Sequence, residues 1–200
     1  LALKNTLRQA PDVILIGEIR DRETMEYGIQ FAETGHLVLA TLHANNSYQA
    51  LNRVISFFPL EVRPMLLQDL SVSLKAIVSQ RLVKTVEGGR TPAMEVLLNT
   101  RNVQELIEKG EVNEIKEAME KSMSPGSQTF EQDLFRLVRQ GKITSEEALT
   151  NADSATNLGL LLGNSGIMPA MGEKVKIPQR PGAPSFSEFK LTEDSEQRFG

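Results

Sequence analysis

The chain has 200 residues, of which 40% are hydrophobic and none is cysteine. This composition excludes a wholly disordered or collagen-like chain, and it excludes disulfides and thiolate metal sites. The 22 basic and 26 acidic residues give a net charge of −4, so no overall basic excess points to nucleic acid or to an anionic membrane surface. No apolar run approaches the roughly 20 residues that span a bilayer. We therefore expect a soluble, cytoplasmic globular protein.

The first 42 residues predict an α/β unit. Residues 1–9 have helical spacing without a preceding cap, so we expect the chain to begin inside a larger domain. The apolar run of residues 13–16 predicts a strand buried on both faces, as in a parallel sheet. Asp21 suits the cap of a helix over residues 22–33, and the apolar residues 36–42 predict a second strand. Strand, helix and strand in this order predict a βαβ unit.

The next part of the sequence is expected to form two helices, followed by a β-hairpin. A helix should run from Asn46 or Ser47 to about Phe57. A second helix should start just after Pro59, with apolar residues at helical spacing: Leu66, Leu70, Leu74, Ile77 and Val78. Residues 83–86 and 92–98 flank a Glu-Gly-Gly turn, which predicts a β-hairpin.

Three or four short helices are predicted after the hairpin, over about residues 100–109, 111–122, 128–140 and 145–150. Thr144 and Glu147 have the spacing of a capping box at the start of the last one. From about Asn151 the helical pattern fails, and prolines and glycines accumulate. We therefore expect an α/β part over residues 1–98, a small helical subdomain over residues 99–158 and a disordered tail over residues 159–200.

The segment DVILIGEIRD, residues 12–21, places a carboxylate after a predicted buried strand. Ligands bind at the carboxyl ends of the strands in α/β sheets. In a nucleotide hydrolase such a carboxylate orients the attacking water or holds the Mg²⁺ shell. Glu18 suits this role, and Arg20 and Asp21 could hold its side chain or reach a phosphate. The structural alternative is that Glu18 ends the strand and pairs with Arg20 at the surface.

Both histidines lie in ETGHLVLATLHAN, residues 33–45. In an extended strand, His36 and His43 would lie roughly 23 Å apart, which argues against a shared metal unless the strand breaks after Thr41. His43 should follow the end of its strand, at the same sheet edge as Glu18, where an imidazole can accept a hydrogen bond or contact a phosphate. Taken singly, each histidine has a structural alternative. The two motifs together favour a function.

LRQAPDVILIGEIRD and ETGHLVLATLHAN resemble the Walker B box and the histidine box of the secretion ATPases, which drive type II and type IV secretion and type IV pilus assembly and retraction. The resemblance covers residues 1 to about 158. It implies the C-terminal part of a RecA-like, P-loop ATPase core that works as a hexamer with ATP and Mg²⁺. It also implies that Glu18 is the catalytic glutamate and that His36 and His43 sense or contact the nucleotide. The supporting residues would be Arg20, Asp21 and Thr41.

Within this superfamily, residues 20–46 and the NADS segment, residues 151–154, most resemble the type IV pilus twitching-motility ATPases. In the related retraction ATPases, a subdomain helix carries arginines where this chain has Gln104 and Glu108, which favours the twitching-motility group. The resemblance implies a pilus-retraction motor at the cytoplasmic face of the inner membrane. Its partners would be further copies of itself, the retraction ATPase and the pilus platform protein, with no nucleic acid.

The sequence contains no Gly-x-x-x-x-Gly-Lys-Ser/Thr loop, so we expect this chain to be the C-terminal portion of a longer protein. Two alternatives stay open. The first is a type II secretion or pilus-extension ATPase, a branch in which a tetracysteine zinc motif is common. The second is a non-catalytic assembly fragment. Arg53 and Arg81 are candidates for an arginine finger at a subunit boundary, or for ordinary salt bridges.

Overall fold

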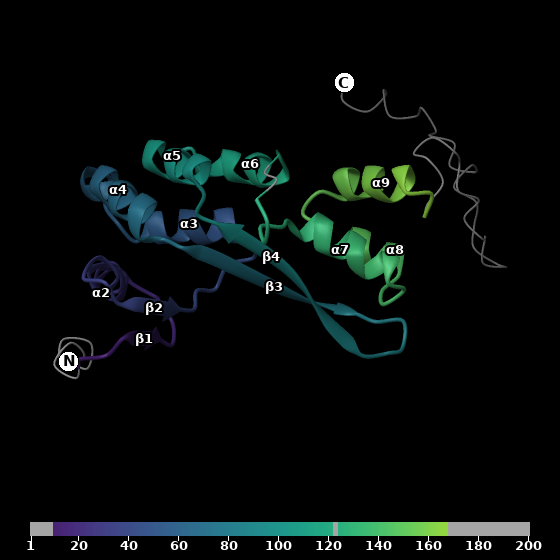
Figure 1. Ribbon diagram of the computed structural model, residues 1–200, viewed down its shortest axis with the longest axis horizontal. Helices are drawn as coiled ribbons and strands as arrows, with labels where there is room; N and C mark the ends of the chain where they lie inside the picture. The colour runs from purple at the N-terminus through teal and green to yellow at the C-terminus, as the bar shows by residue number, and fades with distance from the viewer. Residues whose placement is uncertain (1–9, 122–123, 168–200) are drawn as a thin grey trace, which may run out of the picture.

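A βαβ unit forms the N-terminal end of the computed structural model, which describes residues 10–121 and 124–167 (Figure 1). It consists of β1 (Val13–Ile16), α2 (Arg22–Glu33) and β2 (Leu37–Ala40). The two strands pair in parallel, with Val13 opposite Leu37. After α2, Gly35 has a φ of +94°, a conformation that suits glycine, and the chain turns there into β2. The predicted βαβ unit is confirmed.

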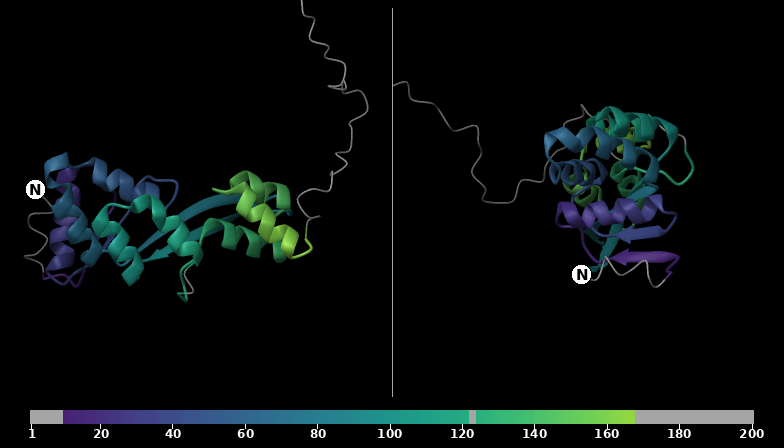
Figure 2. Two further views of the ribbon diagram at one scale, coloured as in Figure 1. Left: turned by 90° about the horizontal axis from the view of Figure 1, so that it is seen from above. Right: turned by 90° about the vertical axis from the view of Figure 1, so that its left-hand side faces the viewer.

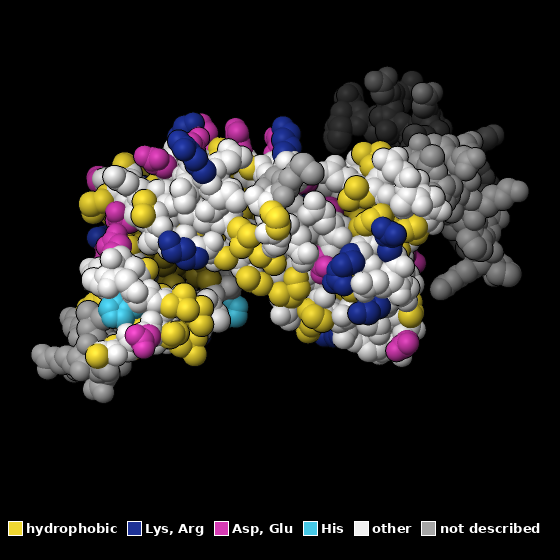
Figure 3. Space-filling view, viewed as in Figure 1, with side chains coloured by type: hydrophobic (Ala, Val, Ile, Leu, Met, Phe, Trp, Pro, Cys, Tyr) yellow, Lys and Arg dark blue, Asp and Glu magenta, His cyan; other side chains and the backbone are white. Residues whose placement is uncertain are grey.

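Only one face of this two-stranded sheet is covered among the described residues. Ile14 and Ile16 are buried on the side of α2, where the side chain of Ile16 reaches Gly28. The opposite face is apolar but about half exposed or more: Val13, Leu15, Leu37 and Leu39. Figure 3 shows hydrophobic side chains gathered on the surface in this region. The prediction that β1 is buried on both faces is therefore wrong for the described chain, because no described helix packs on the outer face.

Two helices follow, α3 (Ser47–Ser56) and α4 (Arg63–Ser73), with the short 3-10 helix η2 (Leu60–Val62) between them. The sequence predicts that α3 begins at Asn46 or Ser47, and the side chain of Asn46 caps the helix. The helix after Pro59 is shorter than expected, because Leu74 already has an extended backbone conformation, with ψ of 138°. Ile77 and Val78 therefore lie in a strand, which suits two adjacent β-branched residues.

The long hairpin consists of β3 (Ala76–Lys84) and β4 (Arg90–Leu98), which pair from Ala76–Leu98 to Lys84–Arg90. Gly88 turns the chain with a φ of +91°. Both strands begin before the predicted limits of 83 and 92, and β3 ends at Lys84. The early start of β3 was missed because polar residues in its middle interrupt its apolar pattern. Figure 1 shows the hairpin running from the βαβ side of the molecule to the C-terminal helices.

Six further helical segments follow: α5 (Arg101–Lys109), η3 (Val112–Glu114), α6 (Ile115–Lys121), α7 (Phe130–Arg139), α8 (Ser145–Asn151) and α9 (Ala155–Asn164). Thr144 caps α8 as predicted, but the Glu147 carboxylate accepts the N–H of Lys84 and leaves the capping box incomplete. Helix α9 was not predicted. Residues 159–164, expected in the disordered tail, form its second half, where Leu162 is fully buried. Residues 168–200 lie outside the described residues.

The buried side chains form two clusters, which share the hairpin. The first contains residues of β1, α2, α3, α4, α5, η3 and α6, together with Leu97 of β4. The second contains Val83 and Ala93 of the hairpin and residues of α7, α8 and α9. The buried apolar side chains of α5 and α6 thus pack with the α/β part, whereas the predicted subdomain over residues 99–158 grouped these helices with α7 and α8. Figure 2 shows the two groups separated along the hairpin. None of the helices in the described part of the chain is long and apolar enough to cross a membrane.

Candidate functional site

The carboxyl ends of β1 and β2 present the candidate site, and Thr41 joins them. The Thr41 hydroxyl donates to the carbonyl of Gly17. Its backbone also accepts the N–H of Ile19 at 2.9 Å and donates to Ile16 at 3.4 Å. These three contacts fix the segment on which Glu18 lies. Thr41 thus contacts the backbone on both sides of Glu18.

The Glu18 carboxylate lies between the side chains of Arg20 and His43. Arg20 forms an ion pair with one oxygen, and His43 Nε2 lies 3.2 Å from the other oxygen, Oε1. The hydrogen bond from Arg20 lowers the pKa of Glu18, and the positive charges of Arg20, His43 and Arg53 lower it further. Glu18 is therefore ionised near neutral pH, in the form that accepts a hydrogen bond from water. Its side chain is 21% exposed, so a ligand can reach it.

His43 also lines a shallow hollow beside the Glu18 carboxylate. The hollow is lined by His43, Ala44, Asn45, Gln49 and Arg53. The His43 side chain is 83% exposed, and Arg53 forms no ion pair with any described residue. Two nitrogen-bearing side chains that face solvent next to a carboxylate suit the binding of an anionic group such as a phosphate.

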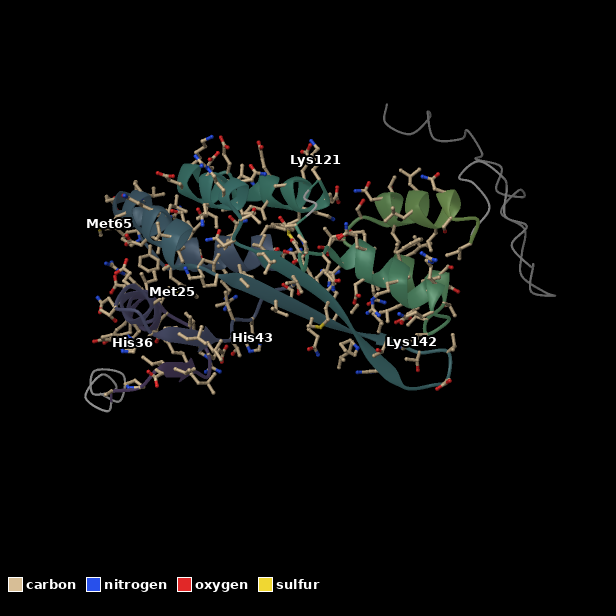
Figure 4. The ribbon with its side chains drawn as sticks, in the orientation of Figure 1. Met25, His36, His43, Met65, Lys121 and Lys142 are labelled. Atoms are coloured by element: carbon tan, nitrogen blue, oxygen red, sulfur yellow. The ribbon has the colours of Figure 1, made fainter. Side chains whose placement is uncertain are left out.

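His36 lies at the opposite end of β2 from His43, as Figure 4 shows. Its Nδ1 atom is 3.0 Å from both the Thr34 hydroxyl and the Phe31 carbonyl, so it holds the turn between α2 and β2. The structure therefore brings Glu18 and His43 together and leaves His36 apart from them. Within residues 10–121 and 124–167, no group of three His, Asp or Glu side chains could hold a metal ion.

Asp21 acts in the fold and not at the carboxylate cluster. Its side chain accepts the N–H of Thr24 at 2.8 Å and caps α2. That hydrogen bond lowers the pKa of Asp21. Of the three predicted supporting residues, Arg20 contacts Glu18 directly, Thr41 fixes its backbone, and Asp21 starts the following helix.

The lowered pKa of Asp21 predicts a pH-dependent contribution to stability. Because the pKa is lower in the folded state, the contribution is present above the unfolded value of about 3.9 and is lost as the pH falls through the folded value. Asp21→Ala should thus lower the melting temperature at about pH 7 and change it much less at about pH 3, whereas Asp21→Asn should retain most of the cap. Thermal unfolding of the full-length proteins measures this. An equal loss at both pH values would contradict the assignment.

The two arginine-finger candidates differ in their surroundings. Arg81 Nη1 donates to the carbonyl of Asn151 at 2.7 Å, and its guanidinium also pairs with Asp153. Arg81 is thus used inside the chain, while Arg53 faces the hollow. The contribution of Asn45 and Gln49 to the hollow was not predicted, because the sequence gives no sign of which residues after His43 line it.

The side chains at this edge suit a nucleotide bound with Mg²⁺. Mg²⁺ is usually held by one or two carboxylates together with substrate phosphates. Glu18 supplies a carboxylate, and Arg53 and His43 supply donors for phosphate oxygens. These residues fit the hydrolytic side of such a site, where charge is neutralised around a phosphoryl group.

The described fold is that of an α/β protein, and comparison with known proteins relates it to ATPases. The described fold matches part of the crystal structure of the pilus retraction motor PilT with bound ADP, at a TM-score of 0.69 and 38% identity, over 76% of this chain and 43% of that one. Residues 1–88 match the family of Type II/IV secretion system proteins. These findings support the secretion ATPase superfamily.

Two relatives from Pseudomonas aeruginosa are similar over most of the chain. The type IV pilus ATPase PilU is 58% identical over 163 residues, which are 81% of this chain and 43% of the relative. The type IV pilus retraction ATPase PilT is 39% identical over 156 residues, which are 78% of this chain and 45% of the relative. The chain thus spans less than half the length of these relatives.

Proposed function

We propose that this chain provides the hydrolytic edge and the C-terminal helices of a type IV pilus ATPase that acts in pilus retraction and twitching motility. The observation that carries the proposal is the cluster of Glu18, Arg20 and His43 at the carboxyl ends of two parallel strands. The similarity to PilU over 81% of the chain supports the pilus system.

The proposal gives each residue of the cluster a task. The Glu18 carboxylate accepts a hydrogen bond from the attacking water and orients it toward the γ-phosphate of ATP. Arg20 holds the carboxylate in place and ionised. His43 and Arg53 face the hollow and donate to phosphate oxygens. Phosphoryl transfer depends mainly on such positioning and on neutralisation of the developing charge.

ATP would be bound together with Mg²⁺, whose chemistry is to neutralise charge on the phosphates. The residues that cradle the β- and γ-phosphates in P-loop ATPases have no counterpart in this sequence. In the full-length protein they would come from outside these 200 residues. His36 would act at a distance, through the turn between α2 and β2.

The same proposal includes the assembly of the motor. The full-length protein would form a hexameric ring at the cytoplasmic face of the inner membrane, and it would work with PilT and the pilus platform protein. The support is the similarity to PilU and PilT over most of the chain. The apolar outer face of the β1–β2 sheet also indicates that further protein covers it in the full-length molecule.

A genetic experiment tests the proposed function against the type II secretion alternative. Deletion of the gene should abolish or strongly reduce the twitching zone and leave secretion of type II substrates unchanged. The intact gene should restore twitching, and the Glu18→Gln allele should not. Loss of secretion with normal twitching would contradict the assignment to the pilus.

A further inference from the structure

The loop of residues 43–46, here called the histidine loop, is held by residues far away in the sequence. Arg81 Nη2 donates to the carbonyl of Asn45 at 3.1 Å. The amide of Asn46 donates to Asp153 Oδ2 at 2.9 Å, across 107 positions of the chain. Asn46 is 1% exposed, so this contact is shielded from water. The histidine loop is thus fastened to β3 and to the connection between α8 and α9.

Arg81 is the centre of these contacts. Besides Asn45, its guanidinium donates to the carbonyl of Asn151 and pairs with Asp153 Oδ1. Its charged carbon also lies 4.0 Å from the centre of the Phe130 ring, in a cation–π contact. With these partners and 20% of its side chain exposed, Arg81 is not available to reach into another subunit.

Asp153 in turn is placed by the second cluster of buried residues. The next residue, Ser154, caps α9, and its N–H donates to Glu131 Oε1 on α7 at 2.7 Å. Glu131 is 2% exposed and pairs with Lys116 at 2.9 Å. The connection between α8 and α9 is therefore anchored on the side of α7 while Asp153 reaches across to the histidine loop.

We propose that Arg81 and Asp153 are positioning residues, which hold the histidine loop so that His43 stands in the correct place beside Glu18 for hydrolysis. The inference rests on the proposed function, because it requires that Glu18 and His43 act on the nucleotide. It makes turnover at the strand edge depend on the placement of Arg81 and of the connection between α8 and α9.

The chemistry of Asp153 suggests the sharpest substitution. Both carboxylate oxygens accept, one from Arg81 and the other from Asn46. Asp153→Asn keeps the shape but replaces one acceptor with an NH₂ group, so one of the two donors must lose its partner. Arg81→Lys is a second, independent variant, because a single ammonium cannot serve three acceptors in the geometry of a guanidinium.

Asp133 offers a matched control. Asp133 is 1% exposed, and its two oxygens accept from an arginine and from an N–H group, those of Arg136 and Met94, as the oxygens of the more exposed Asp153 accept from Arg81 and Asn46. It joins α7 to β4, and its partners within the described part of the chain, Arg136 and Met94, lie outside the histidine loop. Asp133→Asn therefore reports the general cost of loosening the second cluster by the same chemical change.

The full-length variants are tested by steady-state ATP hydrolysis, thermal unfolding and amide hydrogen exchange. Asp153→Asn and Arg81→Lys should lower kcat about 10- to 100-fold and leave KM for ATP within about threefold, since a small misplacement of a catalytic group has this effect. Exchange should become faster in residues 43–49 and stay unchanged in residues 130–139. Asp133→Asn should lower the melting temperature but keep kcat within about twofold of wild type.

The possible outcomes separate the two proposals. If Asp153→Asn and Arg81→Lys keep wild-type kcat while Glu18→Gln loses it, the positioning role is overturned and the proposed function stands. If Glu18→Gln keeps full turnover, the proposed function fails, and the exchange rates alone then decide whether Arg81 and Asp153 hold the loop. Should Asp153→Asn not fold, Arg81→Lys decides, because it keeps the positive charge. A kcat loss of equal size in Asp133→Asn would also overturn the positioning role.

Discussion

Glu18→Gln is expected to abolish turnover of the full-length protein while ATP still binds. The amide has nearly the shape of the carboxylate, but it lacks the negative charge and one of the acceptor positions that orient the attacking water. Loss of such a group lowers kcat by at least about 100-fold. Because nucleotide affinity depends mainly on contacts to the phosphates and the base, the Kd for ATP should stay within about threefold. Phosphate release and calorimetric titration measure the two quantities.

Glu33→Gln provides the control for this substitution. Glu33 is the last residue of α2, in the same βαβ unit, and it is exposed. Its substitution by glutamine removes one negative charge, as Glu18→Gln does. The turnover of the Glu33→Gln protein should stay close to that of the wild type. If Glu18→Gln hydrolysed ATP within a few-fold of the parent rate, Glu18 would not be the catalytic carboxylate.

His43→Ala and His36→Ala are expected to have different effects. His43 is 83% exposed and lies beside Glu18, so its loss should lower kcat about 10- to 100-fold with little change in melting temperature. His36 is half-buried and bonds within the turn before β2, so its loss leaves partners without a hydrogen bond. Such a loss costs about 1–3 kcal/mol, and His36→Ala should lower the melting temperature by several degrees.

The two histidine variants are compared by turnover and thermal unfolding of the same preparations. His36→Gln serves as the conservative variant, because its amide can restore one hydrogen bond in the turn. A stable His36→Ala protein without hydrolysis would reverse the assignment. In that case His36 would be the residue at the nucleotide.

The local pattern predicted the βαβ unit and the position of Glu18. The apolar run before Gly17, the Asp21 cap and Gly35 are local signals, and β1, α2 and β2 formed where these signals lie. The edge that Glu18 and His43 share follows from the parallel pairing of two strands. The separation of His36 and His43 could be predicted because both flank a single extended strand, and Figure 4 shows them at the two ends of β2.

The parts that sequence could not predict depend on tertiary contacts. Helix α9 has two glycines and no charged residue over residues 155–164, and it is stabilised by burial of Leu158 and Leu162 against the second cluster. Likewise, no local pattern indicates that Asp153 meets Asn46 across 107 positions. Arg81 resembled any surface arginine in sequence, and only the folded chain shows how many acceptors surround it.

The β3–β4 hairpin gives the molecule a mechanical property of its own. Nine paired residues in each strand make a stiff ladder about 27 Å long at 3.4 Å per residue. Leu97, near one end, packs in the first cluster, while Val83, near the other end, packs in the second. The hairpin thus connects two clusters of buried side chains, one near each of its ends, and can transmit a rotation of one cluster to the other. A tilt of about 10° at one end would carry the other through about 5 Å, a displacement close to one turn of an α-helix.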